Sequence, residues 1–194
     1  ALGLMKGGAI GNLPEKARQM INVAHNNSMV LTSIINDLLD MEKLVAGKML
    51  FNMRILDVVP IVEQSIANNQ AYATENKVVI RLDKQTDSAF TNMDPDRLIQ
   101  VLANLISNAA KFSPENEIVT IHISTRDKTI RIEVIDNGPG ISNAFRKHLF
   151  EKFAQEDSSD ARTKGGTGLG LAISREFIER MSGQIGYDSV HGSG

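Results

Sequence analysis

One long amphipathic segment near the start of the sequence constrains the fold most. From Pro14 to about Val45, apolar residues return every three or four positions, which predicts one continuous helix. An apolar stripe this wide suits a helical bundle or a dimer partner, and packing within the helix's own domain is the alternative. The companion helix is only a stub, Ala1–Lys6, ending in a glycine-rich turn. The stripe therefore favours a partner helix.

Composition sets the outer limits on function. A length of 194 residues allows one full domain and a smaller piece. The formal net charge of -2 makes binding to nucleic acid or to an anionic membrane an improbable main function. The absence of cysteine excludes disulfides, a thiolate nucleophile and cysteine-bound metal centres. No apolar run approaches the roughly 18 residues of a membrane span, so we expect no membrane contact here, although a longer parent protein could be anchored elsewhere.

Helices and strands alternate after residue 50, which predicts two domains: a helical one over residues 1–50 and a mixed one over residues 51–194. Asp57 and Asp94-Pro95 are helix start signals. The expected elements are helices from Asp57 to about Asn76 and from Asp94 to about Phe112, a strand at Lys77–Asp83, a hairpin of Ile118–Ser124 and Thr129–Asp136, a short helix over Asn143–Phe153, a helix from the next glycine run to Met181 with Gly183 as terminator, and a closing strand at Gln184–Ser189.

The polar face of the Asp94 helix carries the first chemical signal. Asn104, Asn108 and Lys111 follow one another at steps of three or four, so two amides and an ammonium project side by side. An amide oxygen is a suitable ligand for Mg²⁺, and lysine pairs with phosphate. Taken alone, the pattern could equally be a solvated helix face.

A sharp loop, Asp136-Asn137-Gly138-Pro139-Gly140, follows an apolar strand. The Asp136 carboxylate can accept a hydrogen bond from the exocyclic amine of adenine, and it would repel the carbonyl that guanine has at that position. Glycines without Cβ let the backbone approach a flat base. Ordinary turn chemistry explains the same residues equally well.

A third signal is the glycine-rich run Gly165–Leu171, which opens the last helix. Backbone N–H groups and the positive end of a helix dipole both favour a triphosphate. The run lacks the Gly-Lys-Ser/Thr of a Walker A loop, and it does not follow the first strand of a parallel unit as a dinucleotide fingerprint does. Neither of those nucleotide folds is indicated.

Four segments together carry a family resemblance. NLISNAAKF (104–112), DNGPGI (136–141), FEKF (150–153) and GGTGLGLAI (165–173) resemble, in order and spacing, the N, G1, F and G2 boxes of the sensor histidine kinases. LTSIINDLLDMEKL resembles the second helix of that family's dimerisation and phosphotransfer hairpin. The resemblance implies an α+β fold of the Bergerat (GHKL) type, a mixed sheet with helices on one face, preceded by a long hairpin helix.

The same resemblance implies roles for individual residues. Asn108 would coordinate Mg²⁺ and Lys111 would contact the phosphates, with ATP as the bound nucleotide. Asp136 would bind the adenine amine, with Gly138 and Gly140 shaping the pocket. A polar lid, Gln155–Lys164, would be anchored by Phe150 and Phe153, and Gln155 has no clear part. The remaining implied cofactor-binding residues are Asn104, Gly166, Thr167, Gly168, Leu169 and Gly170.

The residue at position 104 separates branches of this superfamily. Gyrase, MutL-type repair proteins and heat-shock chaperones hydrolyse ATP with a Glu four residues before the metal-binding Asn. Here that position holds Asn104, and an amide cannot act as a general base. Water is therefore not the expected nucleophile, and the same absence argues against anti-sigma-type serine kinases.

An acceptor histidine in this family is followed by an acidic residue, Leu, Arg and a polar–Pro pair. His25, His122, His148 and His191 all lack that context, so we expect the acceptor to be absent from this chain and no catalytic residue within it. The resemblance then implies the cytoplasmic ATP-binding core of a two-component histidine kinase. Its partners would be the acceptor hairpin of its own chain or of a homodimer, and a response regulator receiver domain. The alternative is a degenerate nucleotide-binding scaffold or regulatory module.

Overall fold

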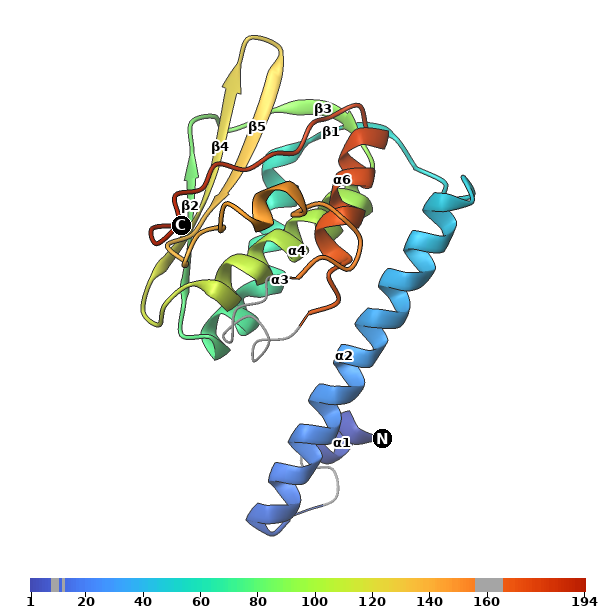
Figure 1. The fold of residues 1–194 in the computed structure, drawn as a ribbon, viewed down its shortest axis with the longest axis vertical. Helices are drawn as coiled ribbons and strands as arrows, with labels where there is room; N and C mark the ends of the chain where they lie inside the picture. Colours follow the sequence, from blue (N-terminus) through green and yellow to red (C-terminus); the bar gives the residue numbers. More distant parts are fainter. Residues whose placement is uncertain (8–10, 12, 156–165) are drawn as a thin grey trace. The chain divides into compact units, whose positions relative to one another are not determined.

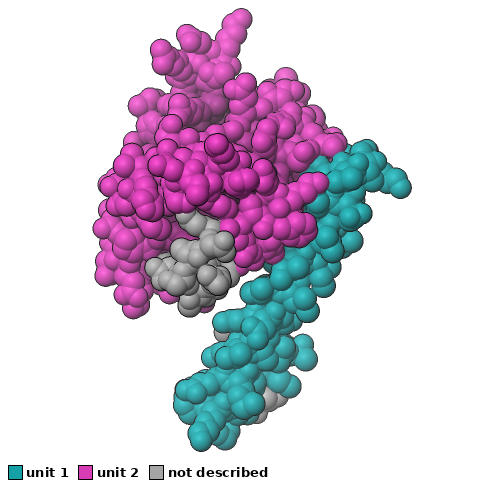
Figure 2. All heavy atoms as spheres, viewed as in Figure 1, with its two compact units in different colours: residues 1–49 teal, residues 50–194 magenta. Residues whose placement is uncertain are grey.

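The computed structural model describes residues 1–7, 11, 13–155 and 166–194. These residues form two compact units, Ala1–Met49 and Leu50–Gly194, which Figure 2 shows in different colours. No helix within the described ranges combines the length and apolarity needed to cross a bilayer.

The first unit consists of helix α1 (Leu2–Lys6) and helix α2 (Glu15–Val45), so the predicted long helix is confirmed. The stub α1 packs against α2, and a Cβ built at Gly3 would lie 3.8 Å from Nε2 of His25. Most apolar side chains in the middle of α2 remain exposed. The expected glycine-rich turn falls largely on residues 8–10 and 12, outside the described ranges.

The second unit is built on a mixed three-stranded sheet (Figure 1). Its strands are β2 (Val79–Lys84), β4 (Ile118–Arg126) and β5 (Thr129–Ile135), in the order β2-β4-β5. β2 runs parallel to β4, whereas β4 and β5 form the predicted antiparallel hairpin, which extends beyond the end of β2 (Figure 1). The expected mixed α+β fold is confirmed.

Three helices of this unit surround the core: α3 (Val58–Glu75), α4 (Pro95–Phe112) and α6 (Gly170–Arg180). α4 packs between α3 and α6 and also contacts the sheet. Alternate residues of β4, namely Val119, Ile121 and Ile123, are fully buried and join the apolar face of α4 in one core. This packing leaves the other face of α4 available for polar side chains.

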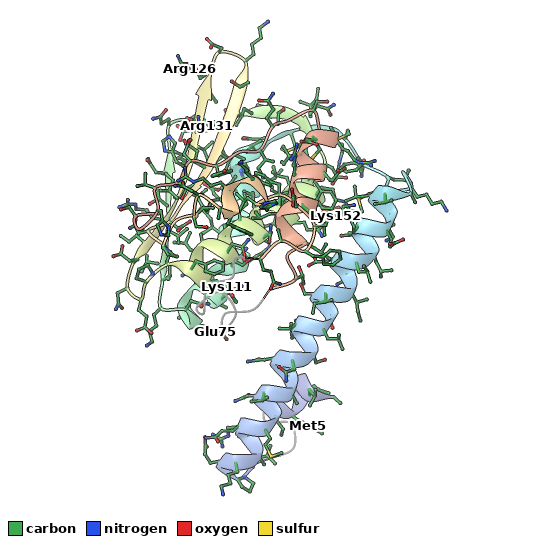
Figure 3. All side chains as sticks on the ribbon, in the orientation of Figure 1. Met5, Glu75, Lys111, Arg126, Arg131 and Lys152 are labelled. Carbon is green, nitrogen blue, oxygen red and sulfur yellow. The ribbon has the colours of Figure 1, made fainter. Side chains whose placement is uncertain are left out.

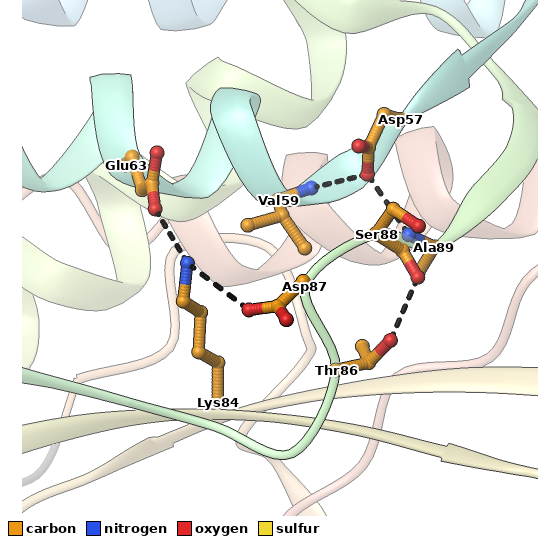
Figure 4. Close-up of polar contacts among 8 residues, drawn as sticks. All are labelled: Asp57, Val59, Glu63, Lys84, Thr86, Asp87, Ser88 and Ala89. Carbon is orange, nitrogen blue, oxygen red and sulfur yellow. Dashed lines mark hydrogen bonds and ion pairs between the residues drawn. The ribbon is translucent and has the colours of Figure 1, made fainter.

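Both predicted helix starts are confirmed by their hydrogen bonds. Oδ1 of Asp57 accepts from the backbone N–H of Val59 at 3.1 Å and of Ala89 at 2.9 Å, so one carboxylate caps α3 and holds the loop that ends at Ala89 (Figure 4). In the same view, Lys84 pairs with Glu63 of α3. A carboxylate serving two backbone donors ties a helix start to a distant segment.

Asp94 plays the equivalent part for α4. Its Oδ1 accepts from the N–H groups of Asp96 and Arg97, at 3.0 and 3.2 Å, while its Oδ2 accepts from the N–H of Asn52 at 2.7 Å. The residue is almost completely buried. The orientation of α4, and of the polar face it presents, therefore rests on this carboxylate.

A small second sheet was not predicted from the sequence. β1 (Arg54–Asp57) and β3 (Phe90–Met93) pair antiparallel, with Arg54 opposite Met93 and Asp57 opposite Phe90. Each strand has only four residues, which is too short for a clear alternating pattern.

Two predicted elements are wrong. In place of a helix over 143–153 there is one turn of 3-10 helix, η1 (Phe145–Lys147), followed by further i→i+3 turns such as Glu151 N–H to the His148 carbonyl at 2.9 Å. In place of a closing strand over 184–189, the backbone forms no sheet ladder with any described strand. Asp188 pairs with Arg131 of the outer strand β5 at 3.6 Å, so the segment reaches this edge through side chains but makes no backbone ladder with it.

The end of α6 differs in detail from the expectation that Gly183 terminates it. The left-handed residue is Ser182, with φ of +61°. The N–H of Gly183 then bonds to the Ile178 carbonyl at 2.9 Å and the N–H of Ser182 to the Glu179 carbonyl at 3.0 Å. This is a Schellman end with serine in the position that glycine usually takes.

Candidate functional site

The polar face of α4 brings two amides together as the helical period predicts. Nδ2 of Asn108 donates to Oδ1 of Asn104 at 3.3 Å, and Nδ2 of Asn104 donates to Oγ of Ser174 on α6 at 3.0 Å. Both asparagines are partly buried, and Ser174 is almost fully buried. Asn104 is thus held between two helices.

Among the described residues, the side chain of Asn108 forms a hydrogen bond through its nitrogen and not through its oxygen. Its Nδ2 is used toward Asn104, whereas Oδ1 accepts no hydrogen bond from the residues that the structure describes. Among those same residues, no cluster of three His, Asp or Glu side chains could hold a metal ion. An amide oxygen that adds one ligand beside phosphate oxygens and water is the arrangement that Mg²⁺ accepts, so the donor set fits this ion.

Lys111 follows one turn after Asn108, toward the C-terminal end of α4 (Figure 3). Its Nζ lies 4.7 Å from the ring centroid of Phe112, and a Cβ built at Gly166 would come within 3.4 Å of this ammonium. The glycine backbone at position 166 therefore runs directly beside a cation. That pairing suits an anion lying along the glycine-rich run.

Asp136 ends β5 in a turn closed by its own side chain. Oδ1 accepts from the N–H of Gly138 at 2.8 Å, and Oδ2 accepts no hydrogen bond from the described part of the chain. A Cβ at Gly138 would lie 2.7 Å from Oδ1 of Asp136 and 3.2 Å from the carbonyl oxygen of Phe112. Glycine at 138 thus lets the Asp136 turn sit against the end of α4.

Gly140 fixes the far side of the same loop. Its φ is +67°, and a Cβ there would overlap the carbonyl oxygen of Val190. The carbonyl of the neighbouring Pro139 accepts from the N–H of Gly192 at 2.7 Å. The loop predicted to approach a flat base is therefore held by the end of the chain, with the second oxygen of Asp136 left to act as an acceptor.

The start of α6 shows the geometry that the glycine-rich run predicts. Oγ1 of Thr167 accepts from the N–H of Leu169 at 3.0 Å, and the Leu169 side chain is buried, so its backbone and not its side chain faces the turn. Leu169, the N-cap residue of α6, makes no side-chain capping hydrogen bond. The first N–H groups and the dipole of α6 can attract an anion.

Two hydrogen bonds, one from a backbone N–H and one from a side chain, join Phe153 and Gln155 to the glycine run. The N–H of Phe153 donates to the Gly168 carbonyl at 2.9 Å, and Nε2 of Gln155 donates to the Gly166 carbonyl at 2.8 Å. Gly168 has φ of +69°, and a Cβ there would lie 2.7 Å from the carbonyl carbon of Phe153. Only glycine permits this approach without strain.

The two phenylalanines expected to anchor the lid behave differently. Phe150 packs with its ring centroid 6.2 Å from that of Tyr187 and 5.9 Å from the guanidinium carbon of Arg175. Phe153 has φ of +62° and leaves 65% of its surface exposed, so its described contact with the glycine run is made by its backbone. Gly165 and the rest of the expected lid, 156–164, lie outside the described residues.

Two of the four histidines lie beside carboxylates. Nδ1 of His122 lies 2.9 Å from Oδ2 of Asp83, and Nδ1 of His148 lies 2.8 Å from Oε2 of Glu151. His25 faces α1, with its Nδ1 buried and lacking a partner among the described residues. His191 lies in the terminal turn.

Ser174 is the residue that sequence reasoning missed. It lies four residues after Gly170, one turn further along the same face of α6, and that spacing is the signal that could have indicated it. A Cβ at Gly170 would overlap Oδ1 of Asn104. Gly170 and Ser174 together therefore fit α6 onto the polar face of α4.

Comparison with known proteins identifies the family. The profile described as "Histidine kinase-, DNA gyrase B-, and HSP90-like ATPase" matches residues 93–194, which include α4, the Asp136 turn and α6. The "Circadian input-output histidine kinase CikA" of Synechococcus elongatus is 34% identical over 188 residues, 96% of this chain. The chain belongs to the sensor histidine kinases. Its second unit is the GHKL ATP-binding domain of that family.

Two further comparisons agree with this histidine kinase assignment. "Sensor protein GacS" of Pseudomonas syringae pv. syringae is 42% identical over 176 residues, 84% of this chain. The crystal structure of full-length ShkA in complex with AMPPNP superposes with a TM-score of 0.78 at 27% identity, covering 99% of this chain and 40% of ShkA. The chain spans 25% of the length of CikA and 19% of GacS, so it corresponds to a segment of each.

Proposed function

We propose that this chain binds ATP with Mg²⁺ and transfers the γ-phosphoryl group to a histidine of a dimerisation hairpin in two-component signalling. One observation supports this most strongly. The amide oxygen of Asn108, near the end of α4, and the second oxygen of Asp136, in the turn after β5 that lies against the end of α4, are both left without a hydrogen bond from the described residues. Acceptors left open in partly buried positions suit a bound ligand.

The nucleotide would be held by three parts of the second unit. Asp136 would accept the adenine amine through Oδ2, because Oδ1 is occupied by Gly138. Lys111, the Gly166 backbone and the N–H groups of Thr167, Gly168 and Gly170 would face the phosphates. Asn108 would supply one ligand to Mg²⁺, which when bound neutralises developing charge on the phosphates.

The protein contributes mostly position and charge to phosphoryl transfer. Asn104 cannot take a proton from water, and its amide is already engaged by Asn108 and Ser174. The site therefore favours transfer to a nucleophile brought from elsewhere over hydrolysis. None of the four histidines fits that part, because none is followed by the acidic residue, Leu, Arg and polar–Pro pair of the family's acceptor.

The exposed apolar side of α2 suits the predicted N-terminal domain, residues 1–50, as part of a dimerisation and phosphotransfer hairpin in a homodimer. The proposed acceptor is a histidine of such a hairpin. A response regulator receiver domain would then take the phosphoryl group. We further propose that this part of the protein works in the cytoplasm, where ATP is available.

The test is phosphoryl transfer to a supplied acceptor. The purified chain is incubated with γ-labelled ATP and Mg²⁺, alone and with a separate helical hairpin that carries the family's acceptor histidine. We expect acid-labile label on the hairpin and none on the chain, and Asn108→Ala should remove the transfer. ATP binding without any transfer would instead support a nucleotide-binding scaffold. Label on His25, His122, His148 or His191 would contradict the assignment of the acceptor.

A further inference from the structure

We infer that Ser174 is a positioning residue, which through Asn104 turns the amide oxygen of Asn108 toward the metal side of the site. The inference rests on the proposed binding of ATP with Mg²⁺. The three side chains form one hydrogen-bonded series across two helices: Asn108 Nδ2 to Asn104 Oδ1 at 3.3 Å, then Asn104 Nδ2 to Ser174 Oγ at 3.0 Å.

The direction of this series follows from amide chemistry. An asparagine side chain has a donor end and an acceptor end, and turning it over exchanges them. Because Nδ2 of Asn104 donates to Ser174, Oδ1 is the atom of this amide that faces Asn108 and accepts its hydrogen bond. Asn108 must then turn its own donor end inward, which leaves Oδ1 outward, with no hydrogen bond from any described residue.

The reverse orientation would be useless for a cation. If Asn104 were turned over, its NH₂ group would face Asn108 and attract the oxygen that Mg²⁺ needs. Asn108 would then present its own NH₂ group to the ligand side, and an amide NH₂ group cannot coordinate a metal. In the arrangement that the structure shows, the Ser174 hydroxyl accepts from Asn104, and this bond holds the productive one of two nearly isosteric arrangements.

The packing of α6 keeps Ser174 in place for this task. Its side chain has 2% of its surface exposed, so water does not compete for the Asn104 amide. Gly170, one turn earlier on α6, has no Cβ where one would overlap Oδ1 of Asn104. The first turn of α6 thus approaches α4 closely enough for the serine to reach the amide.

The measurement is the ratio of ATP affinity with Mg²⁺ to ATP affinity with EDTA, by calorimetric titration of the whole chain. Ser174→Ala should lower this ratio about two- to ten-fold, the range that one hydrogen bond supplies, and leave affinity in EDTA unchanged. Asn104→Ala should lower it similarly. The double variant should show no further loss, because both changes break the same series.

Ser65→Ala is the matched control. Ser65 is a fully buried serine on α3 whose Oγ donates to the Ile61 carbonyl at 2.8 Å. Its loss should lower thermal stability as Ser174→Ala does, yet leave the Mg²⁺ ratio unchanged. A serine with a merely structural role would behave like this control.

The outcomes separate this inference from the proposed function. If the wild-type chain fails to bind ATP, or if Asn108→Ala keeps the Mg²⁺ ratio, the proposed function fails. If Asn108→Ala removes the Mg²⁺ effect while Ser174→Ala keeps the wild-type ratio, only the positioning role of Ser174 is overturned. Should Ser174→Ala not fold, an unchanged ratio in Asn104→Ala overturns it equally.

Discussion

Helices α2 and α4 both carry apolar residues at helical spacing, yet the structure treats the two faces differently. On α4, Ile106 has 0% of its surface exposed and lies in the core of the second unit, whereas Leu31 on α2 has 57% exposed. The period of a sequence pattern shows which side of a helix is apolar, but not what covers it. The second unit buries the apolar face of α4 in its core, whereas most apolar side chains of α2 remain exposed and available to a partner.

This difference can be measured because both tyrosines, Tyr72 and Tyr187, belong to the second unit and the chain has no tryptophan. Tyrosine fluorescence during urea unfolding therefore follows the second unit, while far-ultraviolet circular dichroism follows the helices of both. Changes on α4 should move the tyrosine transition, and changes on α2 should not.

The largest effect should come from the core face of α4. Ile106→Ala removes a fully buried side chain, and a substitution of this kind costs about 2–5 kcal/mol of unfolding free energy. The tyrosine-monitored urea midpoint should fall accordingly. Leu31→Ala, the matched truncation on α2, should lower the free energy of unfolding from the same transition by less than about 0.5 kcal/mol, as surface substitutions do. Equal losses would mean that the two faces are covered alike.

A smaller effect should follow from loss of the α4 cap. Asp94→Ala leaves the N–H groups of Asp96, Arg97 and Asn52 without their acceptor. We expect a loss of about 2 kcal/mol in the same tyrosine transition. Asp96→Ala is the control, because Asp96 is exposed in the first turn of α4 and should cost about 0.5 kcal/mol or less. A cap effect no larger than that of Asp96→Ala would remove Asp94 as the link between α4 and residue 52.

The smallest effect on the second unit should come from charging the exposed face of α2. Leu31→Lys with Leu38→Lys places two like charges seven residues apart on the same side of the helix. The free energy of unfolding measured by tyrosine fluorescence should change by less than about 0.5 kcal/mol. A dimer that the wild-type chain forms at higher concentration should be lost in the variant. Sedimentation velocity of both chains over a range of concentrations measures the second effect. A wild-type chain that stays monomeric throughout would remove the proposed homodimer contact.

Local signals predicted most of the fold. The start of α3 at Asp57 and of α4 at Asp94-Pro95 depends on side chains within three residues of each helix, so the sequence contains the whole cause. The β1–β3 sheet and the missing strand over 184–189 depend on which distant segment lies alongside. Pairing of this kind is set by the assembled fold and cannot be worked out from one stretch of chain.

The candidate site divides in the same way. Helical spacing placed Asn104, Asn108 and Lys111 on one face, and turn chemistry explained why glycine follows Asp136. Ser174 was missed because its role arises only where α6 packs on α4. Phe153 was expected to anchor the lid, whose residues lie outside the described ranges; its side chain is 65% exposed and its N–H donates to the Gly168 carbonyl, a contact that appears only in the assembled fold.

The central claim is that the second unit holds an adenine nucleotide through the second oxygen of Asp136, and base selectivity tests it most directly. Asp136→Asn keeps an acceptor for Gly138 but can turn an NH₂ group toward the base, where it repels the adenine amine and attracts the guanine carbonyl. Calorimetric titration of the wild-type chain should give ATP at least about ten-fold tighter than GTP, and the variant should lose that preference. Equal affinity of the wild-type chain for both nucleotides, or an unchanged preference in Asp136→Asn, would contradict the account.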